Sequence, residues 1–112
     1  MAKYKNKKVI VAGHEFDSKL EAKRYEELLH LGAEGRIKDL RLQPEFELIP
    51  PFFIGKKKFR RAVYRADFAY IDTATGQEVV EDTKGFLTET YKFKRKLFAY
   101  KYGKEIKEIK RK

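Results

Sequence analysis

The sequence contains no cysteine and no long apolar run. Without cysteine the chain can form neither a disulfide framework nor a thiolate zinc site, and the cytoplasm is the expected compartment. The first 16 residues, MAKYKNKKVIVAGHEF, are basic and contain an apolar run of only four residues. Such a run is too short for a signal peptide or a membrane span, so we expect no membrane association.

Aromatic residues and positive charge, in contrast, are plentiful. Apolar residues make up 42% of the 112 positions and include nine Phe and seven Tyr. They suffice for one folded core and predict a single domain over residues 1–112. Lys and Arg outnumber Asp and Glu by 27 to 17, a formal net charge of +10. This charge favours a polyanionic partner such as nucleic acid, although basicity alone is equally typical of a solvated surface.

Residue patterns in the N-terminal half predict strands around one helix. Residues 8–12 are rich in β-branched residues and predict a strand or a hairpin arm. A helix start at Ser18 is followed by apolar residues at helical spacing as far as Leu31. Residues 37–49 alternate in part around Pro44, which indicates either one bent strand or two short ones.

The C-terminal half predicts a hairpin followed by a second helix. Residues 59–71 are rich in aromatic and β-branched residues and predict one long strand, which pairs with a second strand over residues 78–84. Thr88 or Thr90 can cap a helix that ends near Gly103, and the tail beyond it predicts an edge strand or a helical turn. This order predicts an α/β or α+β domain, a mixed β-sheet flanked by two helices.

Glu21 lies where an acidic residue is unexpected. At 100° per residue, its side chain falls in the middle of the apolar arc of the first helix, next to Tyr25 and Leu28. A carboxylate buried there is costly unless a cation or a hydrogen-bond donor meets it. The alternative is structural, because Ser18 and Glu21 have the spacing of a capping box, in which Glu21 bonds back to the Ser18 amide.

Two carboxylates face each other in the predicted hairpin. Asp67 shares a face of the long strand with Arg65 and Ala69, and a four-residue loop sets it directly opposite Asp82. Their charges repel at a Cβ separation of about 5 Å, and a bound Mg²⁺ would neutralise them. Lys84 projects to the same side, where its ammonium can meet a phosphate or an attacking water. The alternative is a solvated face on which Arg65 and Lys84 pair with the two acids.

The spacing of these residues resembles a nuclease motif. Asp67, a gap of fourteen residues and then Asp82-Thr83-Lys84 resemble the PD-(D/E)xK pattern, although Ala66 stands where the motif name has Pro. Glu21 resembles the acidic residue that many members contribute from the preceding helix. The segments GHEFDSKLEAKRYEELL, IKDLRLQPEFEL, YRADFAYID and VVEDTKGFLTETYKFKRKLF are similar to a family of small phage-encoded proteins related to Holliday junction resolvases.

This resemblance implies a restriction-endonuclease-like core and a set of site residues. Asp67, Asp82 and the Thr83 carbonyl would bind Mg²⁺ or Mn²⁺, with Glu21 as a direct or water-mediated ligand. Lys84 would position or activate water. A metal there polarises a phosphodiester oxygen and stabilises developing charge. The implied activity is endonucleolytic hydrolysis of DNA, with Holliday junctions or other branched DNA as substrate, in the cytoplasm of a bacterial host if the protein is phage-encoded.

Three basic segments are candidates for the DNA surface: a basic turn, the second helix and the tail. The predicted contacts are Lys56, Lys57, Lys58, Arg60, Arg61, Lys92, Arg95 and Lys96. On the second helix they lie beside an apolar stripe of Phe86, Phe93, Leu97 and Tyr100. Phosphate contacts of this kind give affinity without sequence preference. The alternative for each segment is a solvated lysine face.

The quaternary state and the exact activity stay open at this point. Symmetric cutting of a four-way junction requires two active sites, so a homodimer is expected if that substrate is correct. A catalytically silent nucleic-acid-binding protein of the same fold is one alternative, and the presence of all four motif residues argues against it. The other is a nicking or end-processing nuclease without junction preference. His14 and His30 have no ligand spacing and are interpreted as turn and surface residues.

Overall fold

The computed structural model describes residues 8–84 and 86–110. In these residues the chain forms β1 (Val9–Val11), β2 (His14–Phe16), α1 (Lys19–Ala33), β3 (Ile37–Leu42), β4 (Glu45–Ile49), β5 (Phe52–Ile54), β6 (Lys57–Phe59), β7 (Ala62–Arg65), β8 (Phe68–Asp72), β9 (Glu78–Lys84), α2 (Glu89–Tyr102) and β10 (Lys107–Lys110). The predicted combination of two helices with β-structure is confirmed.

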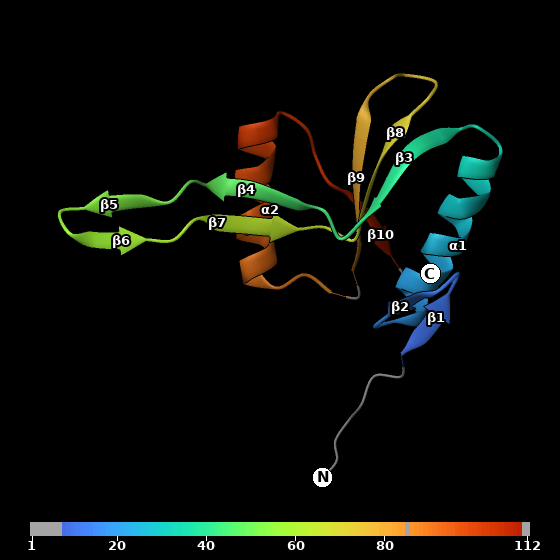
Figure 1. Cartoon of the computed structure of the whole chain (residues 1–112), viewed down its shortest axis with the longest axis horizontal. Coiled ribbons are helices and arrows are strands. Elements are labelled where there is room, and N and C mark those ends of the chain that lie inside the picture. Colours follow the sequence, from blue (N-terminus) through green and yellow to red (C-terminus); the bar gives the residue numbers. More distant parts are fainter. Residues whose placement is uncertain (1–7, 85, 111–112) are drawn as a thin grey trace, which may run out of the picture.

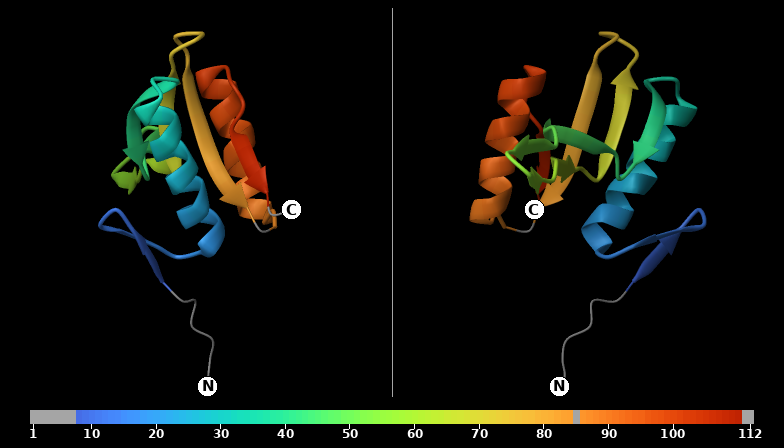
Figure 2. Two further views of the ribbon diagram at one scale, coloured as in Figure 1. Left: turned by 90° about the vertical axis from the view of Figure 1, so that its right-hand side faces the viewer. Right: turned by 60° about the vertical axis from the view of Figure 1, so that its left-hand side comes forward.

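A four-stranded sheet in the order β10-β9-β8-β3 forms the centre of the molecule (Figure 1). β9 pairs antiparallel with β8 and parallel with β10, so the sheet is mixed as predicted. The tail therefore supplies an edge strand, while positions 111–112 lie outside the described residues. α1 and α2 lie on opposite faces of this sheet, as the two views in Figure 2 show.

α1 has the start and the buried face that its sequence predicts. Its N-cap is Ser18, whose hydroxyl oxygen accepts a hydrogen bond from the Glu21 amide at 3.1 Å. The buried side chains of the helix are Glu21, Ala22, Tyr25 and Leu28. Tyr25 and Leu28 pack with Phe68 of β8 in the core cluster on this side of the sheet. The packing holds the first turn of α1, with Glu21 in it, against the sheet.

The ends of α2 also agree with the sequence. Thr88 is its N-cap and accepts a hydrogen bond from the Tyr91 amide at 3.0 Å. Gly103 follows its last turn with a φ of 70°, the left-handed conformation in which glycine is favoured because it has no Cβ. These two caps set the helix so that Tyr91 lies in its first turn, over the end of β9.

The predicted apolar stripe, however, is not the main packing face of α2, because of its four residues only Leu97 packs, within the described residues, against the core cluster under this helix. Phe93 and Tyr100 are 61% and 91% exposed. The buried residues are Tyr91 and Phe98, which pack on Phe46 of β4 in the second core cluster. The helix carries apolar residues on two sides, and spacing alone does not tell which side meets the sheet.

The prediction of one long strand over residues 59–71 is wrong, because the chain breaks twice there into β6, β7 and β8. β7 pairs with β4, whereas β8 pairs with β3 and β9. The second break falls opposite Pro44, which has no N–H to continue the ladder. Ala66 there donates to the Pro44 carbonyl at 3.0 Å. The segment 37–49 correspondingly forms two short strands, one of the two predicted alternatives.

This break also overturns the predicted shared face of the long strand. Ala66 and Ala69 both belong to the core cluster under α2, which positions three apart on one continuous strand could not do. Arg65 is exposed and pairs with Glu45 at 2.6 Å. Arg65 therefore does not share a face with Asp67 and Ala69, and it does not neutralise either aspartate.

β4 to β7 form a two-stranded ribbon that leaves the central sheet and passes beside α2 (Figure 1). β4 and β7 make its inner part, where Phe46 and Tyr64 pair across the strands and are buried. β5 and β6 make its outer part, which extends away from the rest of the molecule. The ribbon and the sheet diverge at Asp67, the residue between β7 and β8.

Candidate active site

The two predicted aspartates come together where the ribbon and the sheet diverge. β8 and β9 have the predicted register, with Phe68 opposite Glu81 and Ile71 opposite Glu78. The next position outward pairs Asp67 with Asp82, and the Asp67 amide donates to the Glu81 carbonyl at 3.2 Å. The predicted juxtaposition of the two carboxylates is thus present at the end of the hairpin.

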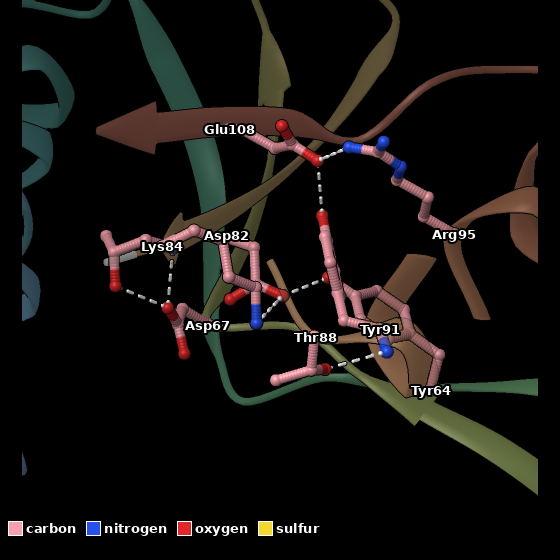
Figure 3. Close-up of polar contacts among 9 residues, drawn as sticks. Tyr64, Asp67, Asp82, Lys84, Thr88, Tyr91, Arg95 and Glu108 are labelled. Carbon is pink, nitrogen blue, oxygen red and sulfur yellow. Dashed lines mark hydrogen bonds and ion pairs between the residues drawn. The ribbon is translucent and has the colours of Figure 1, made fainter. Parts of the chain in front are cut away.

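Asp67 is held by the strand beside it. One of its carboxylate oxygens accepts hydrogen bonds from the Thr83 amide at 2.8 Å and from the Thr83 hydroxyl at 2.7 Å. Both donors lie on β9, and the pair fixes the rotation of the carboxylate (Figure 3). The predicted ligand position Thr83 therefore has a further role that its sequence position did not indicate, since it orients Asp67.

Asp82 is almost fully buried, with 3% of its surface exposed. Its Oδ2 accepts a hydrogen bond from the Tyr64 hydroxyl and lies 3.4 Å from the Lys84 ammonium. Burial, followed by the charge of Asp67, raises the pKa of Asp82 from 3.8 to about 7. The alternative of a solvated carboxylate face is therefore wrong for this residue.

Lys84 lies between a carboxylate and an aromatic ring. Its ammonium is 3.4 Å from Asp82 and 4.1 Å from the centroid of the Tyr91 ring. The Tyr91 hydroxyl donates to Glu108 of β10 at 2.8 Å, and Arg95 also donates to Glu108 (Figure 3). This chain of contacts fixes the ring, and the ring fixes the ammonium beside the two aspartates.

Glu21 is 8% exposed in the first turn of α1. Burial, then the charges of Asp67, Asp17 and Asp82, raise its pKa from 4.5 to about 7, while Lys84 opposes the rise. Ser18 caps the helix, yet within residues 8–84 and 86–110 the Glu21 carboxylate accepts no hydrogen bond. The reciprocal half of the predicted capping box is thus absent there, and Glu21 lies within the electrostatic reach of both aspartates.

The carboxylates of Glu21, Asp67 and Asp82 are chemically suitable ligands for a divalent cation, but they do not surround one completely. No group of three or more His, Cys, Asp or Glu side chains in the described part of the chain is arranged as a metal site. One oxygen of Asp67 accepts hydrogen bonds from Thr83, and one oxygen of Asp82 accepts a hydrogen bond from Tyr64. The second oxygen of each carboxylate is left to coordinate an ion. Mg²⁺ often takes only one or two carboxylates and completes its shell with water and substrate phosphates. The donor set therefore suits such a partly hydrated ion.

A family model described as "Protein of unknown function (DUF1064)" matches residues 1–111. The chain belongs to this family. No curated protein and no solved structure matches it. No helix in residues 8–84 and 86–110 is long and apolar enough to cross a membrane. Because the description of the DUF1064 family assigns no activity, function has to be inferred from the site.

The sequence did not single out the tyrosines of this DUF1064 site. Tyr64 and Tyr91 are buried core residues whose hydroxyls donate to Asp82 and Glu108, and the rings themselves lie 6.2 Å apart. Tyrosine in an apolar strand or helix face is ordinary core composition. The one hint in the sequence was Glu108, an acidic residue in a basic tail. It could not be linked to Tyr91 from the sequence, because the two residues meet only when β10 pairs with β9.

A buried charge cluster on the other face of β9 was also missed. Glu81 is fully buried, accepts hydrogen bonds from Arg24 of α1 at 2.8 and 2.6 Å, and accepts another from the Tyr70 hydroxyl. It neighbours Asp82 in sequence but points to the opposite face of the sheet. Its carboxylate is satisfied by these donors, so it ties α1 to the sheet and is not a further metal ligand.

The predicted DNA contacts fall on two separate surfaces. Lys56, Lys57, Lys58, Arg60 and Arg61 lie on or beside β5 and β6, and Lys92, Arg95 and Lys96 lie on α2. Several of them already have acidic partners. The pairs are Arg61 with Glu45, Lys92 with Glu89 and Arg95 with Glu108. The first group therefore retains more unpaired positive charge than the second.

Proposed function

We propose that this DUF1064 protein is a metal-dependent DNA endonuclease with a restriction-endonuclease-like core. The observation that carries the proposal is the arrangement of Asp67, Asp82 and Lys84. A half-buried Asp67 faces the buried Asp82, and the ammonium of Lys84, two residues along the strand from Asp82, lies 3.4 Å from the Asp82 carboxylate. Burial and the charge of Asp67 raise the pKa of Asp82, so the ionised carboxylate is disfavoured there, and a bound cation would offset this cost.

The residues divide into binding and positioning roles. The free oxygens of Asp67 and Asp82 would hold Mg²⁺ or Mn²⁺, with the Thr83 carbonyl and, directly or through water, Glu21 completing the protein ligands. When bound, the metal supplies a Lewis acid for a phosphodiester oxygen and lowers the pKa of water. Thr83 orients Asp67 through its amide and hydroxyl.

Lys84 would act on the phosphate or on the water that attacks it. Its ammonium is close enough to Asp82 to share a site with the scissile group, and the Tyr91 ring keeps it there without removing its charge. A cation fixed at this place can stabilise the negative charge that develops on the phosphate oxygens. Tyr64 donates to the oxygen of Asp82 nearer Lys84, so that this carboxylate keeps one orientation.

DNA is the proposed substrate because the chain carries a net charge of +10 and because Lys56, Lys57 and Lys58 form no ion pair within residues 8–84 and 86–110. Branched or junction DNA is favoured by the resemblance of the four sequence segments to resolvase relatives. Cleavage of a four-way junction would require a homodimer, because its symmetric incisions need two active sites. The cytoplasm of a bacterial host is the proposed location.

The test is incubation with labelled junction, flap, duplex and single-stranded DNA, with Mg²⁺, Mn²⁺ or EDTA. The proposal expects cleavage only in the presence of a metal ion, and faster cleavage of branched substrates than of duplex. Equal rates on junction and duplex would defeat the junction preference and leave a general nuclease. Absence of cleavage on every substrate with both metals would defeat the endonuclease assignment.

A further inference from the structure

The outer part of the ribbon, residues 50–61 with β5 and β6, has an unusual composition for an exposed hairpin. We call it the β5–β6 arm. It projects from the molecule, and its two strands form a sheet of their own (Figure 1). A hairpin of three-residue strands gains little stability by itself in water. Its exposed side chains are therefore candidates for contact with another molecule.

The arm exposes apolar side chains at its tip. Phe53 and Ile54 are 64% and 66% exposed. Phe52 is 42% exposed and stacks on Phe59 across the hairpin, with ring centroids 4.8 Å apart and an interplanar angle of 5°. The stacked pair stiffens the base of the arm. Phe53 and Ile54 are left at the tip, where burial against a partner would be favourable.

The arm also has a uniform charge. No acidic residue occurs between positions 48 and 66. Within the described residues, Lys56, Lys57, Lys58 and Arg60 form no ion pair, and the Lys57 ammonium lies 5.1 Å from the centroid of the Phe59 ring. A partner that covers this arm should therefore be negatively charged.

Cations and apolar residues are interleaved across the arm. Phe53 is directly opposite Lys58, and Ile54 is directly opposite Lys57. Residues opposite each other share a face, while neighbours along a strand face opposite ways. One face carries Phe53 beside Lys58, and the other carries Ile54 and the stacked Phe52 and Phe59 beside Lys57, so each face mixes apolar side chains with a lysine. A segment that lies on a membrane segregates apolar and charged residues onto different faces, which this arm does not. An unstacked nucleic acid strand, in contrast, offers base faces and phosphates side by side.

We propose that the β5–β6 arm binds unpaired bases of DNA, with Phe53 and Ile54 against the bases and the adjacent lysines on the phosphates. A two-stranded ribbon also fits a DNA groove, and apolar side chains can wedge between base steps. The arm would then give one subunit a preference for branched or partly open DNA. This inference rests on the proposed function only in taking DNA as the partner, and it does not require that the site cleaves.

The chain has no tryptophan, so Phe53→Trp provides a single fluorescent reporter. Binding is measured in EDTA with a forked duplex and a blunt duplex of the same sequence. We expect the forked DNA to quench the reporter strongly and the blunt duplex to quench it weakly. Ile10→Trp, a similarly exposed position on β1 outside the predicted DNA contacts, is the matched control and should respond little to either.

Affinity supplies the second readout. Phe53→Ser combined with Ile54→Ser should weaken binding of forked DNA by about tenfold and binding of blunt duplex by about twofold or less. Lys58→Gln should weaken both to a similar degree. Equal loss on both DNAs in the double variant, or a blue-shifted reporter with anionic phosphatidylglycerol vesicles and no response to DNA, would overturn the proposal. Cleavage is not read here. If the arm does not bind forked DNA but the protein still cleaves DNA with a metal ion, the arm proposal fails and the proposed function is unaffected. If the arm binds forked DNA but the protein does not cleave, the proposed function fails and the arm proposal is unaffected.

Discussion

Asp82→Asn is expected to stabilise the fold above neutral pH and to change it little at about pH 4 or below. Burial and the charge of Asp67 raise the pKa of Asp82 from 3.8 to about 7 in the folded chain. In the unfolded chain the carboxyl group ionises near its ordinary value. The stability that this group contributes is therefore complete below about pH 4 and is lost as the pH rises through about 7.

The size of the effect follows from the shift. A rise from 3.8 to about 7 is about three pKa units, and at about 1.4 kcal/mol per unit it costs the folded state about 4 kcal/mol once Asp82 is ionised. This cost already includes the opposing effects of the Tyr64 hydrogen bond and the Lys84 charge, and imperfect contacts of the Asn amide reduce the benefit, so we expect a net gain of about 2–4 kcal/mol at pH 8.5. For a chain of this length, such a gain raises the melting temperature by about 10 °C.

Unfolding by urea and by heat, followed by circular dichroism in EDTA at about pH 4 and about pH 8.5, measures this difference. Asp39→Asn is the matched control, because Asp39 is exposed and its φ of 56° suits Asn as well as Asp. The expected result is a gain at pH 8.5 that Asp39→Asn does not share. If Asp82→Asn destabilises the fold equally at both pH values, Asp82 is an ordinary stabilising carboxylate and the reasoning fails.

Four further outcomes follow from the same contacts. Glu21→Gln should abolish cleavage in a gel assay while Ser18 still caps α1, so wild-type turnover would return Glu21 to a structural role. Tyr91→Leu should lower kcat much more than it raises KM, because Lys84 loses the ring beside it, whereas Tyr91→Phe should retain most of the activity. Glu81→Gln should lower the free energy of urea unfolding by about 1.5–3 kcal/mol, since the half-buried Arg24 loses its buried partner and keeps only Glu27, with kcat of the folded protein unchanged. Replacing the three lysines at 56–58 by Gln should reduce the slope of log K against log salt by roughly 0.9 per lost contact on duplex DNA, and an unchanged slope in an anisotropy titration would exclude these phosphate contacts.

Local patterns in the sequence predicted the parts of the site that depend on near neighbours. Ser18 and the apolar spacing after it are enough to place Glu21 on the buried face of a helix. The register of the β8–β9 hairpin depends on a short loop, so the pairing of Asp67 with Asp82 could be predicted from loop length. Both features involve residues close in sequence, where the geometry of a helix or a hairpin leaves few choices.

Features that depend on distant partners could not be predicted in the same way. The break at Ala66 follows from Pro44, which lies between β3 and β4 more than twenty residues earlier, and this proline matters only because β7 pairs with β4. Tyr64 meets Asp82 because of this break. Likewise, the two apolar sides of α2 look alike in the sequence, and the exposure of Phe93 is decided by the sheet that packs on the other side.

The most direct test of the central claim compares cleavage and binding by the wild-type chain and Asp82→Asn on one labelled junction. We expect the wild-type chain to cleave the junction with Mg²⁺ or Mn²⁺ and not in EDTA. We further expect that Asp82→Asn does not cleave under any of these conditions but binds the junction in Ca²⁺ with wild-type affinity, because the basic surfaces are untouched. Wild-type cleavage by the variant, cleavage in EDTA, or parallel loss of binding and cleavage would contradict the assignment of Asp82 to a metal-dependent active site.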